Sequence, residues 1–227
     1  MMPIDTYQHR FHDGGPCDLP VGKVVCVGLN YAAHVQEMAS TSTGEPMLFI
    51  KPPTALTPLA DPLFIPEGLG SVHFETELAI LLGHGLSRCL EAEVPAAIAG
   101  LGIALDLTLR DLQKQLREAG HPWEKAKGWD GACPISPFVR PEVLPDLQNI
   151  QLRLERNGEV KQNGNTAQML TPVLPLIAYM SRFFTLSPGD VILTGTPEGV
   201  GPISPKDKIQ VSLDKVLVAG VSDIRWR

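Results

Sequence analysis

The chain has 227 residues, enough to bury a hydrophobic core as one domain, and a formal net charge of −6 at pH 7. With no basic run and 6% aromatic residues, it indicates no nucleic-acid partner, and no apolar stretch is long enough to cross a membrane. The N-terminus has no secretory pattern and the four cysteines lack Cys-x-x-Cys spacing, so we expect a cytoplasmic protein with reduced thiols.

Short apolar runs lie between 21 glycines and 21 prolines, a pattern that predicts an α+β fold with a dominant curved mixed β-sheet and a few short helices. Residues 1–20 are polar and are expected to form an N-terminal extension. Residues 21–227 contain no internal repeat and no clear linker, so we expect a single domain there.

The first half of the chain predicts alternating strands and helices. A strand over residues 23–28 leads to a short helix over residues 30–38, with Asn30 as its cap. A Ser- and Thr-rich segment over residues 39–46 predicts a mobile loop. The strand that follows, residues 48–50, ends at Lys51.

The stretch from Ser71 to Leu82 is central, because from Leu78 onward it reads as a buried strand. The elements predicted after it are a helix over 93–99, a strand over 100–105, a helix capped by Thr108 and Asp111 and ended by Gly120, a proline-broken loop over 121–149 with a short strand near Phe138, a hairpin over 150–160, a helix over 170–184, a strand over 191–193 and a second hairpin over 208–221.

Three acidic residues stand where these strands begin and end. Glu75 and Glu77 are two residues apart at the start of the central strand, so both carboxylates project from one face. Asp106 follows the next strand. Clustered, partly buried carboxylates repel one another unless a cation lies between them. We interpret the three as an all-oxygen metal site; for Glu75 and Glu77 alone, a solvated surface pair is the alternative.

A possible base precedes the mobile loop. His34 and Glu37 are three residues apart and share one face of the predicted helix. A carboxylate that orients an imidazole raises its basicity, so the pair is suited to activate water from a lid. A surface histidine and glutamate on an amphipathic helix are the alternative.

Cations are expected near the acids, because three carboxylates around a divalent ion leave about one negative charge. Lys51 and Lys127 are candidates, with a surface position as the alternative for each. The spacing alone does not separate Lys127 from Lys125. The Gly-rich stretch 194–201 lacks the ending of a nucleotide-binding loop. Its backbone N–H groups and a threonine hydroxyl are instead suited to hold a carboxylate or an oxyanion, and an ordinary tight turn is the alternative.

Six segments together resemble the fumarylacetoacetate hydrolase family, in particular its small acylpyruvate-hydrolase-like branch. They are V-C-V-G-L-N-Y-A-A-H-V-Q-E-M, L-F-I-K-P, S-V-H-F-E-T-E-L-A, A-L-D-L-T-L-R-D-L-Q, P-W-E-K-A-K and L-T-G-T-P-E-G-V-G-P. This resemblance covers the chain from about Lys23 to its end. It implies a mixed β-sheet roll as the catalytic domain over residues 21–227, usually as a homodimer.

The resemblance also implies roles for individual residues. Mg²⁺ or Mn²⁺ would lie on Glu75, Glu77 and Asp106. Catalytic residues would be His34, Glu37 and, in preference to Lys125, Lys127. Substrate-contacting positions match Arg110, Gln113 and Thr196, with Lys51 added as a candidate cation. Two departures from close relatives are His73-Phe74, where His-His is frequent, and Leu29, where many carry a polar or basic residue; we expect Leu29 to affect which acyl group fits.

These observations predict a divalent-metal-dependent hydrolase of acylpyruvates or related 2,4-dioxo acids. It would cleave a C–C bond through a metal-bound enolate, releasing pyruvate and a carboxylic acid after water activated by His34 attacks the distal carbonyl. The same metal site would serve an oxaloacetate decarboxylase or an oxaloacetate keto–enol tautomerase, neither of which needs water. A non-catalytic protein stabilised by its cation is the remote alternative. The expected partner is a small 2-oxo acid.

Overall fold

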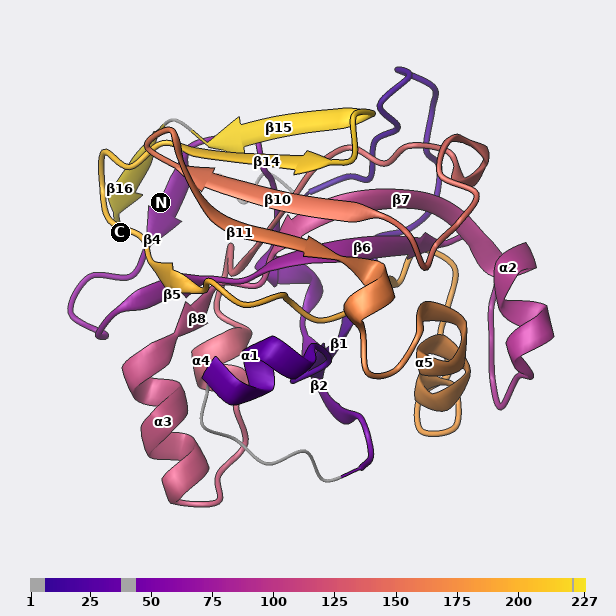
Figure 1. The fold of residues 1–227 in the computed structure, drawn as a ribbon, viewed down its shortest axis with the longest axis horizontal. Helices are drawn as coiled ribbons and strands as arrows, with labels where there is room; N and C mark the ends of the chain where they lie inside the picture. The colour runs from indigo at the N-terminus through magenta and orange to yellow at the C-terminus, as the bar shows by residue number, and fades with distance from the viewer. Residues whose placement is uncertain (1–6, 38–43, 222) are drawn as a thin grey trace.

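The computed structural model describes residues 7–37, 44–221 and 223–227, so most of the predicted mobile loop and Met38 lie outside the described residues. A seven-stranded mixed sheet forms the centre of the protein (Figure 1). Its strands, in spatial order, are β2 (Met47–Lys51), β1 (Val24–Gly28), β12 (Val191–Leu193), β6 (Thr76–Leu82), β7 (Ile98–Leu105), β9 (Cys133–Ile135) and β3 (Leu56–Pro58).

A four-stranded antiparallel sheet packs across β6 and β7, and two smaller sheets lie at the margin. The four strands are β11 (Glu159–Asn165), β10 (Gln151–Arg156), β14 (Ile209–Leu213) and β15 (Leu217–Val221). The smaller sheets are β13 (Gly201–Pro202), β5 (Val72–Phe74) and β8 (Thr108–Leu109), and β16 (Ile224–Trp226) with β4 (Leu63–Ile65). The described helices are α1 (Ala32–Glu37), α2 (Val94–Ala97), α3 (Arg110–Glu118), α4 (Glu124–Lys127) and α5 (Val173–Met180). The predicted α+β class is confirmed.

The seven-stranded sheet is buried on both faces, as β6 shows. Leu78 and Ile80 belong to the core that includes the inner side chains of the four-stranded sheet. Ala79 and Leu81, which alternate with them, belong to a second core with Phe138. A strand buried on both faces must be apolar throughout, which explains the unbroken run after Glu77.

Both predicted hairpins are confirmed. Strands β10 and β11 pair antiparallel around Asn157 and Gly158. Their φ angles of 57° and 81° are the positive values that a tight turn compatible with strand twist requires. Strands β14 and β15 form the second hairpin.

Three local predictions were wrong. Asn30 does not cap α1; its side-chain amide donates to the carbonyl oxygens of Thr171 (3.0 Å) and Thr194 (2.9 Å) and accepts from the Thr171 N–H. Thr108 lies in β8 and its hydroxyl faces Glu75 and the Asp106 carbonyl, so it does not cap α3. The Asp111 carboxylate accepts from the Ser71 N–H, outside the helix. Tertiary partners replaced the local ones that capping rules assume.

The predicted loop over residues 121–149 was also incomplete. It contains helix α4, which carries Lys127, and strand β9. Phe138 makes only an isolated bridge to Phe11 and belongs to no strand. The helices predicted over 93–99 and 170–184 are shorter in the structure, as α2 and α5. None of the helices in the described part of the chain combines the length and apolar character of a membrane span.

The segment over residues 7–20 lies against the second core. Phe11 is 7% exposed, and the Arg140 guanidinium lies 3.5 Å from its ring centroid. Backbone hydrogen bonds of 2.8 Å join His12 and Arg10 to Phe138. The division into an N-terminal extension over residues 1–20 and a domain over residues 21–227 stays a prediction. It can be tested through the contacts that residues 7–20 make with the core.

Replacing Phe11 by alanine should lower the free energy of unfolding by about 3 kcal/mol, because it empties a site in the core. Val143→Ala is the control, since Val143 is 48% exposed, and it should change stability by no more than about 0.5 kcal/mol. Urea unfolding of both variants measures the difference. Equal losses would mean that the segment adds nothing to the stability of the domain.

Candidate active site

The three acids meet because β6 begins where β7 ends. In the antiparallel register Thr76 pairs with Leu105, and the Asp106 N–H donates to the Glu75 carbonyl at 2.8 Å. Sheet geometry alone therefore brings an acid at the end of one strand next to the acids at the start of its neighbour.

Glu75, Glu77 and Asp106 each offer a carboxylate oxygen within 4.8 Å of the other two. All three residues are buried, with 5%, 1% and 1% of their surfaces exposed. Burial, together with the charges of Asp106 and Glu75, raises the pKa of Glu77 well above its usual value. A cluster of hard oxygen donors whose repulsion is not fully relieved fits a divalent cation such as Mg²⁺ or Mn²⁺.

Lys127 lies between two of these carboxylates. Its Nζ donates to Glu75 Oε2 at 2.8 Å and to Asp106 Oδ2 at 2.7 Å. Burial by itself would lower the pKa of Lys127, but the two acids outweigh it and raise that pKa. Lys125, by contrast, is exposed. The structure therefore separates the two lysines that the spacing left equivalent.

Arg110 adds a second cation, since its guanidinium donates to Glu75 and, at 2.6 Å, to Gln113. Burial would raise the pKa of Glu75, but Lys127 and Arg110 overcome that effect and hold the pKa well below its usual value. Glu75 therefore stays ionised in a buried position.

Lys51 is fully buried and contacts the third acid. Its Nζ lies 2.7 Å from Asp106 Oδ1 and donates to the carbonyl oxygens of Lys127, Ala132 (3.1 Å) and Leu107 (3.4 Å). This environment favours a role in orienting Asp106. Direct contact between Lys51 and a substrate stays a prediction.

A cavity of about 500 Å³ opens at Glu75 and Lys127. One wall consists of polar side chains from α3, namely Arg110, Asp111, Gln113, Lys114 and Arg117. Another wall is mainly apolar and consists of Leu29, Met47, Phe49 and Trp123. The cavity can thus take a molecule with an anionic end toward the cations and an apolar or bulky part toward Leu29. The backbone of Leu29 has a φ of 60°, which is unusual for a leucine.

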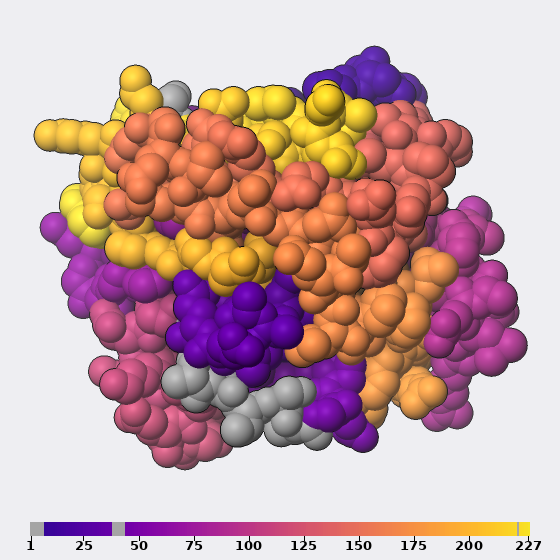
Figure 2. Space-filling model, viewed as in Figure 1, coloured from indigo at the N-terminus to yellow at the C-terminus, as the bar shows by residue number. Residues whose placement is uncertain are grey.

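Helix α1 brings the predicted base to this cavity. His34 lines it and is 4% exposed, and its Nδ1 lies 3.1 Å from Glu37 Oε2. The other Glu37 oxygen accepts from the Gly199 N–H at 3.1 Å. In Figure 2, α1 covers the middle of the visible face beside the golden segment near residue 200. The dyad is therefore held between the cavity and the Gly-rich loop.

The Gly-rich loop also holds a candidate metal ligand. The Gly195 N–H donates to Glu77 Oε2 at 2.6 Å. Gly195 has a φ of 94°, and a Cβ there would lie 2.7 Å from the Asn30 Cβ, so only glycine fits. Beside it, Thr196 Oγ1 accepts from Gln162 Nε2 at 2.8 Å.

Sequence reasoning missed Gln162, which is 1% exposed. The signal available was a polar residue at a position that faces inward on β11, where strand alternation expects an apolar one. Its partners are more than 30 residues away on either side, so the pattern alone could not name them.

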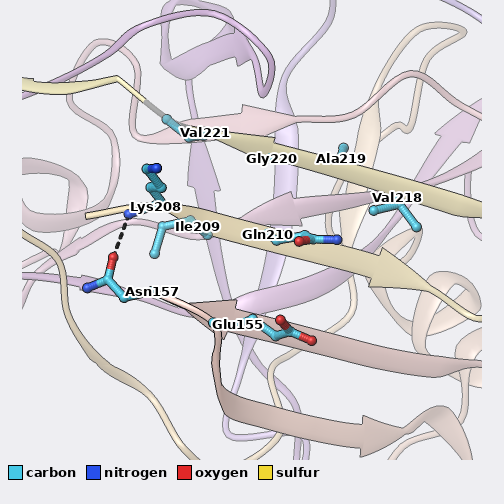
Figure 3. Close-up of a pocket in the computed structure, with 10 residues that line it drawn as sticks. Glu155, Asn157, Lys208, Ile209, Gln210, Val218, Ala219, Gly220 and Val221 are labelled. Carbon is cyan, nitrogen blue, oxygen red and sulfur yellow. Dashed lines mark hydrogen bonds between the residues drawn. The ribbon is translucent and has the colours of Figure 1, made fainter. Parts of the chain in front are cut away.

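A second hollow lies on the four-stranded sheet, where Figure 3 shows side chains from β10, β14 and β15. Asn157 accepts from the Lys208 N–H at 2.9 Å there, while Glu155, Gln210 and Val218 lie along the strands. No residue of the acidic cluster lines this hollow. The cavity at Glu75 and Lys127 is therefore the candidate active site.

Comparisons with known proteins show what the chain is similar to. Residues 23–222 match the family model for the fumarylacetoacetate (FAA) hydrolase C-terminal region. The chain is 55% identical over 209 residues to the oxaloacetate tautomerase YcgM of Escherichia coli K12, covering 92% of this chain and 95% of the relative. It is 44% identical to the mitochondrial oxaloacetate tautomerase FAHD1 of Mus musculus, with 86% and 88% covered.

A solved structure extends the likeness. The fumarylpyruvate hydrolase from Pseudomonas aeruginosa, in complex with Mn²⁺ and pyruvate, superposes with a TM-score of 0.90 at 34% identity. The match covers 96% of this chain and 95% of that protein. The fold implied by the sequence resemblance is thereby confirmed.

Replacing Glu77 by glutamine should weaken Mn²⁺ binding by about 10- to 100-fold or more. Losses of that size follow removal of the outer partners of metal ligands, and loss of a ligand should matter at least as much. The substitution keeps the side-chain size and removes the charge. Titration calorimetry with Mn²⁺ measures the affinity, and Glu124→Gln, on the exposed side of α4, is the control. Unchanged affinity in Glu77→Gln would remove Glu77 from the ligand set.

Proposed function

Because the chain belongs to the fumarylacetoacetate hydrolase family, and because it is 55% identical to a relative named as an oxaloacetate tautomerase, we propose that it catalyses the keto–enol tautomerisation of oxaloacetate. The observation that carries the proposal is a cavity lined by both His34 and Glu75, the latter a member of the buried carboxylate cluster. This reaction was the alternative to acylpyruvate hydrolysis in the sequence prediction, and the comparisons favour it.

The charges around the cavity support a substrate with two carboxylates. With a metal ion bound, all three acids would be ionised. Their three negative charges would be balanced by Lys51, Lys127 and Arg110, which form ion pairs with Glu75 and Asp106. A divalent ion would leave two positive charges in a buried site. Oxaloacetate carries two negative charges and would neutralise them, whereas a simple acylpyruvate carries one.

The carboxylates of Glu75, Glu77 and Asp106 would hold Mg²⁺ or Mn²⁺. When bound, such an ion supplies a Lewis acid for the keto oxygen of a 2-oxo acid. Lys127 and Arg110 present positive charge to the same cavity and would orient the substrate carboxylates.

His34 would move the proton. Its Nδ1 faces a carboxylate, which only accepts, so Nδ1 carries the hydrogen and Nε2 is left as a base. Nε2 would take a proton from C3 of the keto form and return it to the C2 oxygen, which completes the enol and leaves His34 as it began. Glu37 holds the imidazole in the tautomer that this transfer needs.

Acylpyruvate-type hydrolysis is the second candidate, because the same dyad could activate water. The likeness to a fumarylpyruvate hydrolase supports it. Both reactions need proton removal by His34, but hydrolysis also needs a water molecule and room for a larger acyl group beside Leu29.

A substrate panel should separate the two functions. With Mn²⁺ present, the purified protein should speed the loss of enol-oxaloacetate absorbance, with a higher kcat/KM than for hydrolysis of fumarylpyruvate or acetylpyruvate. Carbon dioxide release from oxaloacetate is followed in parallel to detect decarboxylation. Faster hydrolysis than tautomerisation would replace the proposal with the second candidate.

Replacing His34 by alanine should lower kcat for tautomerisation by about 10²- to 10⁴-fold, the range usual for loss of a positioned acid–base group. Mn²⁺ affinity should stay close to that of the wild type, because His34 is not among the clustered acids. His84→Ala, at an exposed position, should retain full activity. A His34→Ala variant that turns over normally would exclude His34 as the base.

A further inference from the structure

Gln162 uses its whole side-chain amide inside the protein. Its Oε1 accepts from the Thr76 N–H at 2.9 Å. Its Nε2 donates at 2.8 Å to both Thr196 Oγ1 and the Pro197 carbonyl oxygen. With 1% of its surface exposed, the amide cannot exchange these partners for water, so all three contacts constrain the fold.

The segments joined by Gln162 both determine where Glu77 lies. Thr76 stands between the two candidate ligands Glu75 and Glu77, and Thr196 follows Gly195, whose N–H holds Glu77 Oε2. One side chain therefore sets the distance between the strand that carries a ligand and the loop that orients it.

The packing beside Gln162 leaves little freedom for that distance. A Cβ added to Gly164 would lie 2.4 Å from the Pro197 Cβ, and one added to Gly199 would lie 1.9 Å from the Lys161 carbonyl oxygen. Strand β11 and the Gly-rich loop are thus in contact on both sides of the amide. The same Gly199 donates to Glu37, so the loop connects Gln162 with the dyad as well.

The hydrogen bond to Thr196 also has a direction. Because Nε2 can only donate, Thr196 Oγ1 is the acceptor, and the hydroxyl hydrogen is left to donate elsewhere. Thr196 is 2% exposed and is not among the residues that line the cavity at Glu75 and Lys127, so its contact with a substrate oxygen stays a prediction of the sequence resemblance.

We infer that Gln162 is a positioning residue for the active site. It holds the Glu75–Glu77 segment against the Gly-rich loop and keeps the Thr196 hydroxyl as a donor toward the substrate. The second part rests on the proposed function, and the first part concerns metal affinity and stands independently of the reaction.

The chain offers a matched control for a merely structural crosslink. Gln148 also joins two backbone segments: its Nε2 donates to the Thr166 carbonyl oxygen and its Oε1 accepts from the Val173 N–H at 3.1 Å. It contacts none of the clustered acids. Methionine has a similar length and no amide, so Gln162→Met removes three such hydrogen bonds at a buried position and Gln148→Met removes two at a half-buried one.

Thermal unfolding, Mn²⁺ titration and oxaloacetate kinetics are measured for both methionine variants. Both should lower Tm. Only Gln162→Met should weaken Mn²⁺ binding, by about 10- to 100-fold as for outer partners of metal ligands, and lower kcat. Wild-type Mn²⁺ affinity in Gln162→Met, or an equal loss in Gln148→Met, would overturn the inference.

A double-mutant cycle tests the coupling to Thr196. Thr196→Val should lower kcat, Thr196→Ser should restore it, and Gln162→Met combined with Thr196→Val should lose no more kcat than the worse single variant. Fully additive losses in kcat would contradict coupling.

If Gln162→Met does not fold, Gln162→Glu replaces it. This variant keeps the acceptor for the Thr76 N–H and has no N–H for Thr196. Its kcat should fall, and a wild-type kcat would refute the inference.

The experiment separates this inference from the proposed function. A wild-type protein without oxaloacetate turnover would refute the proposed function, while the Mn²⁺ affinities of the two methionine variants would still test the role of Gln162. A wild-type protein that binds no Mn²⁺ would overturn both.

Discussion

The structure depends on keeping three carboxylates close together inside a protein core. Their oxygens lie within 4.8 Å of one another, and such a cluster is destabilising unless positive charge and N–H donors surround it. Lys127, Arg110 and Lys51 supply the charge, and Gly195 supplies an N–H. Each comes from a different element, so β2, α3, α4 and the loop after β12 must all meet at the ends of β6 and β7.

The positive charge is shared unequally among the three carboxylates, and this determines where an added cation would be bound most favourably. Glu75 contacts two cations directly and Asp106 also contacts two. Among the residues that the structure describes, no cation lies within ion-pairing distance of Glu77, and its pKa is raised. An added cation would therefore gain most from Glu77, while the positive groups already present would act on whatever anion fills the cavity.

Sequence reasoning succeeded where the determinants were local and failed where they were distant. The period of a strand and the place of Asp106 at the end of a second strand were enough to expect Glu75, Glu77 and Asp106 together. Helix spacing was enough for His34 and Glu37. Capping rules failed at Asn30 and Thr108, because both side chains bind partners from remote strands. Gln162 and the burial of Lys51 depend on contacts across long loops, which no local pattern encodes. The apolar wall of the cavity likewise consists of side chains that lie far apart in the sequence, namely Leu29, Met47, Phe49 and Trp123.

Glu37 divides its two carboxylate oxygens between an imidazole on its own helix and a backbone amide on the opposite loop. Docking of α1 and orientation of the base are therefore one event. A ligand bulky enough to keep α1 away from Gly199 would meet an imidazole whose partner has lost its second anchor. An oversized molecule in the cavity would thus meet a histidine whose orientation is no longer fixed.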